Sequence, residues 1–145
     1  MPVVAYASIS DSPPLVAVAC NPHAFTCKLC VKGRAFSLSL LDARSLDVFE
    51  ELAAVSGAKV EDKLAEVGLV HAPGARVDAP VISGSAATIE CSLHSKRRFG
   101  DHVLLVGKVE ACYASGDFSD FWAYKEYRPI LYTGWRGGMT TYRRR

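Results

Sequence analysis

The stretch with the strongest chemical potential in this sequence is the turn Asn21 to Thr26, which joins an apolar run to the short segment Cys27–Val31. If that segment is helical, Thr26 lies at its N-terminus, where backbone N–H groups and the helix dipole favour an anion. His23 and Lys28 add positive charge beside the Thr26 hydroxyl. We interpret this turn as a candidate site for a terminal phosphate group. The alternative is that Thr26 is only a helix N-cap and His23 a solvated loop residue.

The chain has five cysteines, and two of them form a C-x-x-C pair, Cys27 and Cys30. Such a pair serves redox chemistry or zinc binding, but a zinc ribbon needs a second pair. Cys20 and His23 could complete four ligands only through a cramped loop. We therefore predict no metal site and interpret the cysteines as small thiols, most of them buried. They are Cys20, Cys27, Cys30, Cys91 and Cys112.

The sequence carries none of the common self-sufficient catalytic motifs. It contains no G-x-x-x-x-G-K-[ST] phosphate loop, no G-x-G-x-x-G after a strand and no H-E-x-x-H zinc motif. It also contains no G-x-S-x-G nucleophile elbow. An enzyme of this size without such a motif often takes its reactivity from a bound cofactor.

Composition indicates one globular domain over residues 1–145. Half of the residues are hydrophobic and 22% are charged, which is typical of a folded chain rather than a disordered one. The formal net charge of +2 does not by itself favour nucleic acid or an anionic membrane. No apolar run is long enough to span a membrane, and the first residues do not resemble a secretion signal. We expect a cytoplasmic protein with no membrane contact.

Hydrophobic periodicity predicts a mainly β chain with a few short helices. Alternating or continuous apolar runs predict strands, and the polar stretch 95–101 predicts a hairpin link between two of them. Apolar residues at helical spacing predict two helices, each followed by a glycine. The pattern favours an antiparallel barrel, in which Gly107 suits a tight bend or a close ligand approach. The predicted strands are 15–20, 35–40, 87–94, 102–109 and 129–132, and the predicted helices are 46–53 and 60–67.

Seven short pieces of the sequence, in order, resemble the motifs of the flavin reductase family. One piece would be weak evidence, but chance rarely preserves the order and spacing of seven. The pieces are Pro13-Pro14-Leu15-Val16-Ala17-Val18, Asn21 to Thr26, Gly33 to Leu38, Ala79-Pro80-Val81-Ile82, Ile89-Glu90-Cys91, Gly100 to Val109 and Arg128 to Gly134.

The resemblance implies a fold and a cofactor. The expected fold is a six-stranded antiparallel split β-barrel, usually a homodimer, that binds FMN or FAD near the subunit interface. Thr26 with Asn21 would hold the flavin phosphate region, and His23 lies where relatives place a basic residue. The segment Tyr6-Ala7-Ser8 would face the isoalloxazine edge. His102 would lie towards the flavin or nicotinamide, or would only pin its hairpin turn.

The function we expect is that of an NAD(P)H-dependent flavin oxidoreductase. The flavin would carry the chemistry, so no side chain need act as an acid or base, and the acceptor would be free flavin, ferric iron or a protein. A second hypothesis is a flavin-binding electron carrier without its own NAD(P)H site. A third is a nucleic-acid-binding barrel, which the aliphatic and small hydroxyl strand faces disfavour.

Two features are left open by these hypotheses. The basic clusters 96–98 and 143–145 could contact nucleic acid phosphates, attract an anionic pyridine nucleotide, or simply be solvated. The aromatic-rich stretch 118–127 could form a lid, a dimer contact or a helix packed on the barrel.

Overall fold

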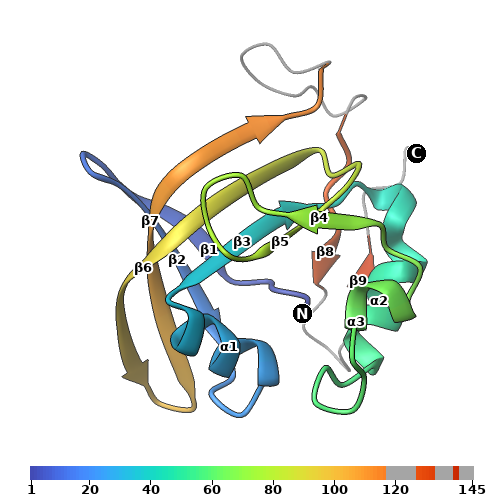
Figure 1. Ribbon diagram of the computed structural model, residues 1–145, viewed down its shortest axis with the longest axis horizontal. Coiled ribbons are helices and arrows are strands. Elements are labelled where there is room, and N and C mark those ends of the chain that lie inside the picture. The colour runs from blue at the N-terminus through green and yellow to red at the C-terminus, as the bar shows by residue number, and fades with distance from the viewer. Residues whose placement is uncertain (117–126, 133–138, 141–145) are drawn as a thin grey trace.

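The computed structural model describes residues 1–116, 127–132 and 139–140, and its dominant feature is a curved antiparallel sheet (Figure 1). One helix, α1, lies against this sheet, and the remaining helices gather on the side towards which β3 runs (Figure 1). The elements in chain order are β1 (Tyr6–Asp11), β2 (Pro14–Cys20), α1 (Phe25–Gly33), β3 (Ala35–Leu40), the 3₁₀ turn η1 (Ala43–Ser45), α2 (Leu46–Ala54), α3 (Lys63–Glu66), β4 (His71–Pro73), β5 (Pro80–Ile82), β6 (Ala87–Phe99), β7 (His102–Ala114), β8 (Leu131–Tyr132) and β9 (Met139–Thr140).

The main sheet has five strands in the order β1-β2-β7-β6-β3, and every pair of neighbours is antiparallel. The strands β4 with β5 and β8 with β9 form two separate short ribbons. The prediction of a mainly β, antiparallel chain with a few short helices is confirmed. Within the described residues the main sheet is open, with β1 and β3 as its edges, so it does not form a closed six-stranded barrel.

Several predicted elements agree closely with the structure. The strands predicted at 15–20 and 35–40 are β2 and β3, and the helix predicted at 46–53 is α2. These segments carry strong signals, because β2 is apolar throughout, β3 alternates cleanly and α2 places Leu52 in the core. The second predicted helix is shorter than 60–67, since α3 contains only Lys63–Glu66.

The predicted hairpin was wrong in its extent. Residues 95–99, predicted as a polar link, continue β6, and the chain turns only around Gly100, whose φ is +56°. Every residue from His94 to Phe99 is exposed, because β3 pairs with β6 only as far as Ser92, and this end of β6, in what we call the β6–β7 ribbon, is then an edge of the described sheet. Backbone pairing with β7, such as that of Arg97 with Leu104, makes this segment a strand. Its polar and exposed sequence has no apolar alternation, so the sequence alone gave no strand signal.

The strand β1 was not predicted. Its residues pair with β2, for example Ala7 opposite Ala17, and it forms one edge of the sheet. Five of its six residues are exposed, so the segment lacks the buried alternate positions by which a strand is recognised.

The core forms where the inner face of the sheet meets α1. Val18, Leu105 and Cys91 are buried from the sheet, and Cys27 is buried from the helix. Gly107 allows the close approach of Phe36, because a Cβ at position 107 would overlap the ring of Phe36 and approach the Cβ of Cys91 to 2.6 Å. The group that approaches Gly107 closely is thus a core aromatic ring, whereas the sequence suggested a tight bend or a ligand.

Part of the sequence-based interpretation falls outside the described residues. This applies to the aromatic side chains from Phe118 to Tyr124 and to the terminal cluster Arg143–Arg145. Within the residues that are described, no helix is long and apolar enough to cross a membrane.

Candidate functional site

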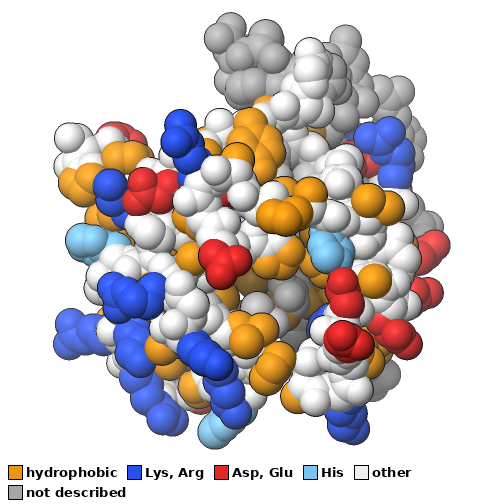
Figure 2. All heavy atoms as spheres, in the orientation of Figure 1, with side chains coloured by type: hydrophobic (Ala, Val, Ile, Leu, Met, Phe, Trp, Pro, Cys, Tyr) orange, Lys and Arg blue, Asp and Glu red, His pale blue; other side chains and the backbone are white. Residues whose placement is uncertain are grey.

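A cavity of about 1030 Å³ opens beside α1, between β3 and the segment that runs from α2 through α3. Figure 2 shows a hollow in this face of the molecule with hydrophobic side chains around it. The wall is mainly apolar, but it carries hydroxyl, carboxylate and imidazole groups at separate points. Its aromatic and large aliphatic members include Phe25, Leu29, Phe36, Phe49, Leu52 and Ile130.

The N-terminal turn of α1 forms one side of this cavity, through Phe25 and Thr26. The helix begins at Phe25, two residues earlier than the predicted segment Cys27–Val31, and Ala24, which has no side-chain oxygen, is its N-cap. No side chain in the described part of the chain makes a cap hydrogen bond there. The first-turn N–H groups therefore lack the acceptor that a Ser, Thr, Asp or Asn cap would supply. Thr26 is the second helical residue, so the alternative interpretation of it as an N-cap is wrong.

The turn before α1 is held by Asn21. Its Oδ1 accepts a hydrogen bond from the backbone N–H of His23 at 2.8 Å, and its carbonyl accepts one from Ala24 at 3.0 Å. These bonds bend the chain from β2 into the helix, as asparagine commonly does in such turns. Neither Asn21 nor His23 contributes to the cavity wall.

The opposite wall is organised by a buried carboxylate, Glu90, which has no exposed surface. Its oxygens accept hydrogen bonds from the backbone N–H groups of Ala75 (3.0 Å), Arg76 (2.7 Å) and Val77 (3.0 Å), and from the Tyr113 hydroxyl at 3.1 Å. Burial alone would raise the pKa of Glu90, but these hydrogen bonds outweigh burial and lower it.

The loop around Glu90 requires a glycine at its start. A Cβ on Gly74 would lie 2.6 Å from the Val77 carbonyl oxygen and 2.8 Å from Glu90 Oε2. The loop leads directly to Asp78, Ala79 and Pro80 in the cavity wall. By holding residues 75–77, Glu90 therefore fixes the loop that leads into this wall of the cavity.

The same wall is attached to β3 by two serines. Ser37 Oγ donates a hydrogen bond to the Pro80 carbonyl, and Ser39 Oγ accepts one from the Ile82 N–H at 3.2 Å. Both serines lie on the face of β3 that the sequence showed as small hydroxyls, and both line the cavity. These hydroxyls link β5 to the edge of the main sheet.

A segment from the C-terminal part of the chain closes a third side. Tyr127, Pro129 and Ile130 line the cavity, and the segment is held by Asp42. The Asp42 carboxylate accepts from the Arg128 N–H at 2.9 Å, and the Ala43 N–H donates to the Arg128 carbonyl at 2.8 Å. Burial raises the pKa of the Tyr127 phenol, and the negative charge of Asp42 contributes to that shift.

A carboxylate–imidazole pair lies at the rim of the cavity. Asp62 Oδ2 lies 2.7 Å from His71 Nε2, while Asp62 Oδ1 accepts from the backbone N–H groups of Leu64 and Ala65. The hydrogen bond from the Ala65 N–H, followed by that of the imidazole, lowers the pKa of Asp62. The pair caps α3 and links it to β4, and both side chains belong to residues that line the cavity.

Three cysteines gather between β2 and α1, and Cys20 and Cys30 line the cavity. Burial, followed by interaction with Cys27, raises the pKa of Cys20 to about 12. Burial also raises the pKa of Cys30. These are conditions for neutral, unreactive thiols. Within the described residues all five cysteines are free, and no group of three His, Cys, Asp or Glu side chains could hold a metal ion.

The predicted site residues lie in three places. Tyr6 and Thr26 line the cavity. Ala7, Ser8, Asn21, His23 and Lys28 lie in β1 or around the start of α1, outside the cavity wall. His102 lies at the turn of the β6–β7 ribbon, where its Nδ1 is 2.8 Å from Asp101 Oδ1.

Sequence reasoning missed most of the wall. Glu90 is the only charged residue in the apolar and hydroxyl stretch 87–93 of β6, and this could have marked it. Asp42 and His71 carry no local sequence pattern that marks a site. The fold alone brings Arg128 to Asp42, and it likewise brings Asp62 to His71.

Comparison with known proteins identifies the family. A family model described as the flavin reductase like domain matches residues 1–134. The chain belongs to the flavin reductase-like family.

Two curated relatives illustrate the range of this family. An uncharacterized protein of Aeropyrum pernix is 34% identical over 126 residues, which cover 86% of this chain and 48% of the relative. A flavin reductase of Pseudomonas putida is 30% identical over 139 residues, covering 96% of this chain and 73% of the relative. The chain spans about half the length of the first curated relatives that it matches.

Solved structures of the flavin reductase-like family share the fold. The FMN-binding protein of Thermus thermophilus superposes with a TM-score of 0.80 at 30% identity, covering 97% of this chain and 76% of that one. The flavoredoxin of Desulfovibrio vulgaris (Miyazaki F) superposes with a TM-score of 0.82 at 20% identity, with the same coverage. At that lower identity the likeness concerns the fold alone.

Proposed function

We propose that this protein is an FMN-binding oxidoreductase that passes electrons from NAD(P)H through the flavin to an acceptor. The observation that carries the proposal is the cavity of about 1030 Å³ with the uncapped N-terminal turn of α1 in its wall. This arrangement occurs in a chain whose family match covers residues 1–134. The flavin reductase of P. putida and the FMN-binding protein of T. thermophilus support the choice of flavin.

The volume and the wall chemistry of the cavity support FMN as the ligand. Ligand cavities commonly measure about 300–1,000 Å³ and combine apolar walls with a few polar groups, which agrees with the wall described here. The flavin phosphate is an anion that suits the α1 N-terminus with the Thr26 hydroxyl. The ring offers apolar surface that Phe36, Leu52 and Ile130 can cover.

We assign the cofactor-binding residues in two groups. Thr26, Asn21, His23 and Lys28 would hold or attract the phosphate, Thr26 directly and the others by shaping the turn or supplying charge. Tyr6 with Ala7 and Ser8 would face the ring edge from β1. FAD is the alternative flavin.

The chain's own contribution would be binding and orientation. Bound FMN supplies hydride and electron chemistry, so the protein needs no catalytic acid or base. The apolar wall would exclude water from the ring, and the rigid loop held by Glu90 would keep that wall in place. NADH or NADPH would be the donor.

We further propose a homodimer with the split-barrel arrangement of the family. His102 lies outside the cavity of its own chain, at an exposed turn. A contact between His102 and flavin or nicotinamide would then cross the interface to a second copy.

Titration with FMN, followed by steady-state NADH and NADPH oxidation, tests the function. We expect quenching of flavin fluorescence on binding and turnover of at least one nicotinamide. Flavin uptake with no nicotinamide oxidation would support the second candidate, an electron carrier. Absence of flavin uptake would overturn both.

A further inference from the structure

Positive side chains are concentrated on one part of the surface, which we call the basic face. In residues 21–34 and 94–102 the sequence has six Lys or Arg residues and a single acidic residue, Asp101. All six basic residues are exposed. The basic face consists of Lys28 and Lys32 of α1, Arg34 at the C-cap of α1, and Lys96, Arg97 and Arg98 of the β6–β7 ribbon.

The two parts of the basic face are joined directly. The Leu93 N–H donates to the Arg34 carbonyl at 2.8 Å, and Arg34 Nη2 donates to the Leu93 carbonyl at 3.2 Å. The end of α1 is therefore fixed to β6 where the ribbon begins. Figure 2 shows Lys and Arg side chains gathered over α1 and the projecting end of β6 and β7.

Negative side chains are concentrated on the other side of the cavity. Residues 42–66, which contain η1, α2 and α3, have seven acidic and three basic residues. Figure 2 shows acidic side chains gathered on this side. The charge is thus distributed as a dipole across the cavity opening, although the chain as a whole carries only +2.

The basic face does not converge on one small anion. Neighbouring residues of a strand point to opposite faces, so Arg97 lies on the other side of β6 from Lys96 and Arg98. The basic face therefore extends around both sides of this sheet edge. Arg97 stacks its guanidinium on the ring of Phe99, 5.2 Å from the centroid, and Phe99 is 53% exposed. Arginine and exposed aromatic rings are residue types enriched in protein–protein contacts, and a broad positive surface suits a large partner of opposite charge.

We propose that the basic face docks an acidic protein that accepts electrons from this protein's flavin. The inference rests on the proposed function and specifies its acceptor as a protein with a negative surface. The face extends from α1, whose first turn lines the cavity, so a partner bound there lies beside the cofactor site. Opposite charge would accelerate encounter and orient the two proteins, and salt would weaken both effects.

The test follows electron transfer from the reduced, FMN-loaded protein to an acidic flavodoxin by stopped-flow absorbance. Riboflavin, a neutral small acceptor, is the reference. The triple variant Lys96→Glu, Arg97→Glu, Arg98→Glu changes only the exposed ribbon. The triple variant Asp47→Lys, Glu50→Lys, Glu51→Lys on α2 is the matched control for charge reversal.

We expect the ribbon variant to slow transfer to flavodoxin by roughly tenfold at low salt, and the α2 variant to leave it unchanged or faster. The difference between the two variants in the rate of transfer to flavodoxin should vanish at high salt. Transfer to riboflavin and uptake of FMN should be equal in all three proteins, and equal FMN uptake also shows that the variants are folded.

Other results would overturn the inference, and they can be told apart. Equal flavodoxin rates in both variants, with normal FMN uptake, would reject the acidic partner and leave the proposed function intact. Failure of the parent protein to take up FMN would reject the proposed function and the redox role of the face with it. Tighter binding of a single-stranded oligonucleotide than of flavodoxin, or low-salt self-association abolished in the ribbon variant, would assign the face to nucleic acid or to a second copy.

Discussion

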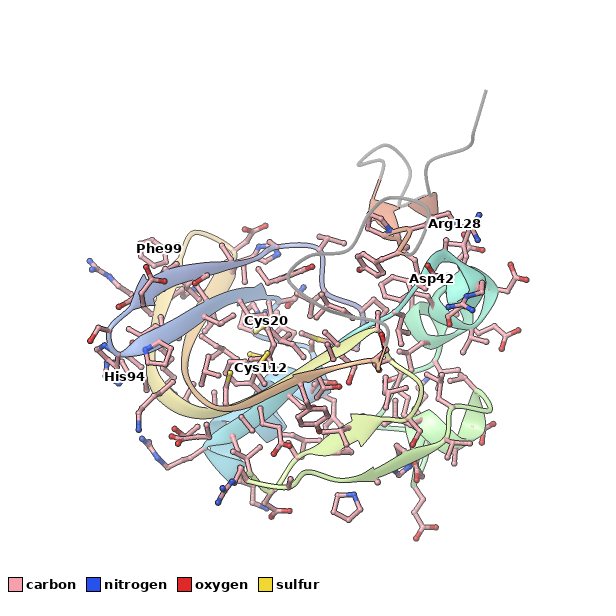
Figure 3. All side chains as sticks on the ribbon, turned by 90° about the horizontal axis from the view of Figure 1, so that it is seen from above. Cys20, Asp42, His94, Phe99, Cys112 and Arg128 are labelled. Carbon is pink, nitrogen blue, oxygen red and sulfur yellow. The ribbon has the colours of Figure 1, made fainter. Side chains whose placement is uncertain are left out.

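Asp42 and Arg128, which are 86 residues apart in sequence, are joined by a 2.9 Å hydrogen bond from the Arg128 backbone N–H to Asp42 Oδ2. Figure 3 shows both residues at one end of the molecule, far from His94 and Phe99 at the other. Asp42 Oδ1 also accepts from the Arg44 N–H at 3.0 Å and from Arg44 Nε at 2.9 Å. One carboxylate therefore caps η1 and attaches the segment that closes the cavity.

Substituting Asp42 by Ala should detach this segment. The side chain is only 11% exposed and accepts three hydrogen bonds, so we expect a loss of about 1–3 kcal/mol in the free energy of unfolding. Urea denaturation measures it. Asp47→Ala, at an exposed position in α2, is the control and should cost less than about 0.5 kcal/mol. Equal losses in the two variants would contradict the role of Asp42.

Glu90 predicts a specific pH dependence of stability. Because its pKa is lowered in the folded protein, the unfolded chain binds the proton more readily. The contribution of ionised Glu90 to the free energy of unfolding is therefore complete above the ordinary glutamate pKa. It is lost as the pH falls through the lowered pKa of the folded protein. Urea unfolding from about pH 6 to about pH 3 should show a steeper decline in the parent protein than in Glu90→Gln. Parallel curves would show that Glu90 does not contribute in this way.

Gly107→Ala should disrupt the contact with Phe36. A methyl group there overlaps the Phe36 ring, and we expect a destabilisation of about 1–3 kcal/mol, measured by thermal unfolding. Gly33→Ala is the control, because a Cβ at Gly33 meets nothing within 4 Å. Combining Gly107→Ala with Phe36→Leu should recover part of the loss, and strict additivity would argue against the contact.

The cysteines should differ widely in reactivity. Cys112 is exposed, whereas Cys91 is fully buried and burial raises its pKa to about 12. We expect iodoacetamide at mildly alkaline pH to label Cys112 at least roughly 100-fold faster than Cys20 or Cys91. Peptide mass spectrometry gives the rates. Similar rates in the folded protein would contradict the buried placement, and denatured protein provides the reference for full labelling.

Thr26 allows the proposed phosphate contact to be tested. Removing its hydroxyl in Thr26→Val should raise the Kd for FMN about tenfold, while Thr26→Ser should retain most of the affinity. Riboflavin lacks the phosphate, so its Kd should be the same in both variants. Fluorescence titration measures the Kd values for FMN and for riboflavin in the parent protein and in both variants. An equal loss of riboflavin affinity in Thr26→Val would indicate a general disturbance of the cavity.

The family and the mainly β fold were predictable from the sequence because their signals are local. The apolar run of β2, the alternation of β3 and the ordered motifs from Pro13 to Gly134 each depend on neighbouring residues. The position of Thr26 at the start of α1 follows in the same way, since it depends on where one helix begins.

Only the tertiary structure decided how the cavity is built. The backbone N–H groups that donate to Glu90 come from a loop 13 to 15 residues away in sequence. The contact of His71 with Asp62 depends on the packing of β4 beside α3. The same holds for the polar end of β6, which is a strand because its backbone pairs with β7, whose Leu105 lies in the core. Local patterns record which face of an element is buried. They do not record which distant backbone groups satisfy a buried charge, and those contacts form the cavity wall.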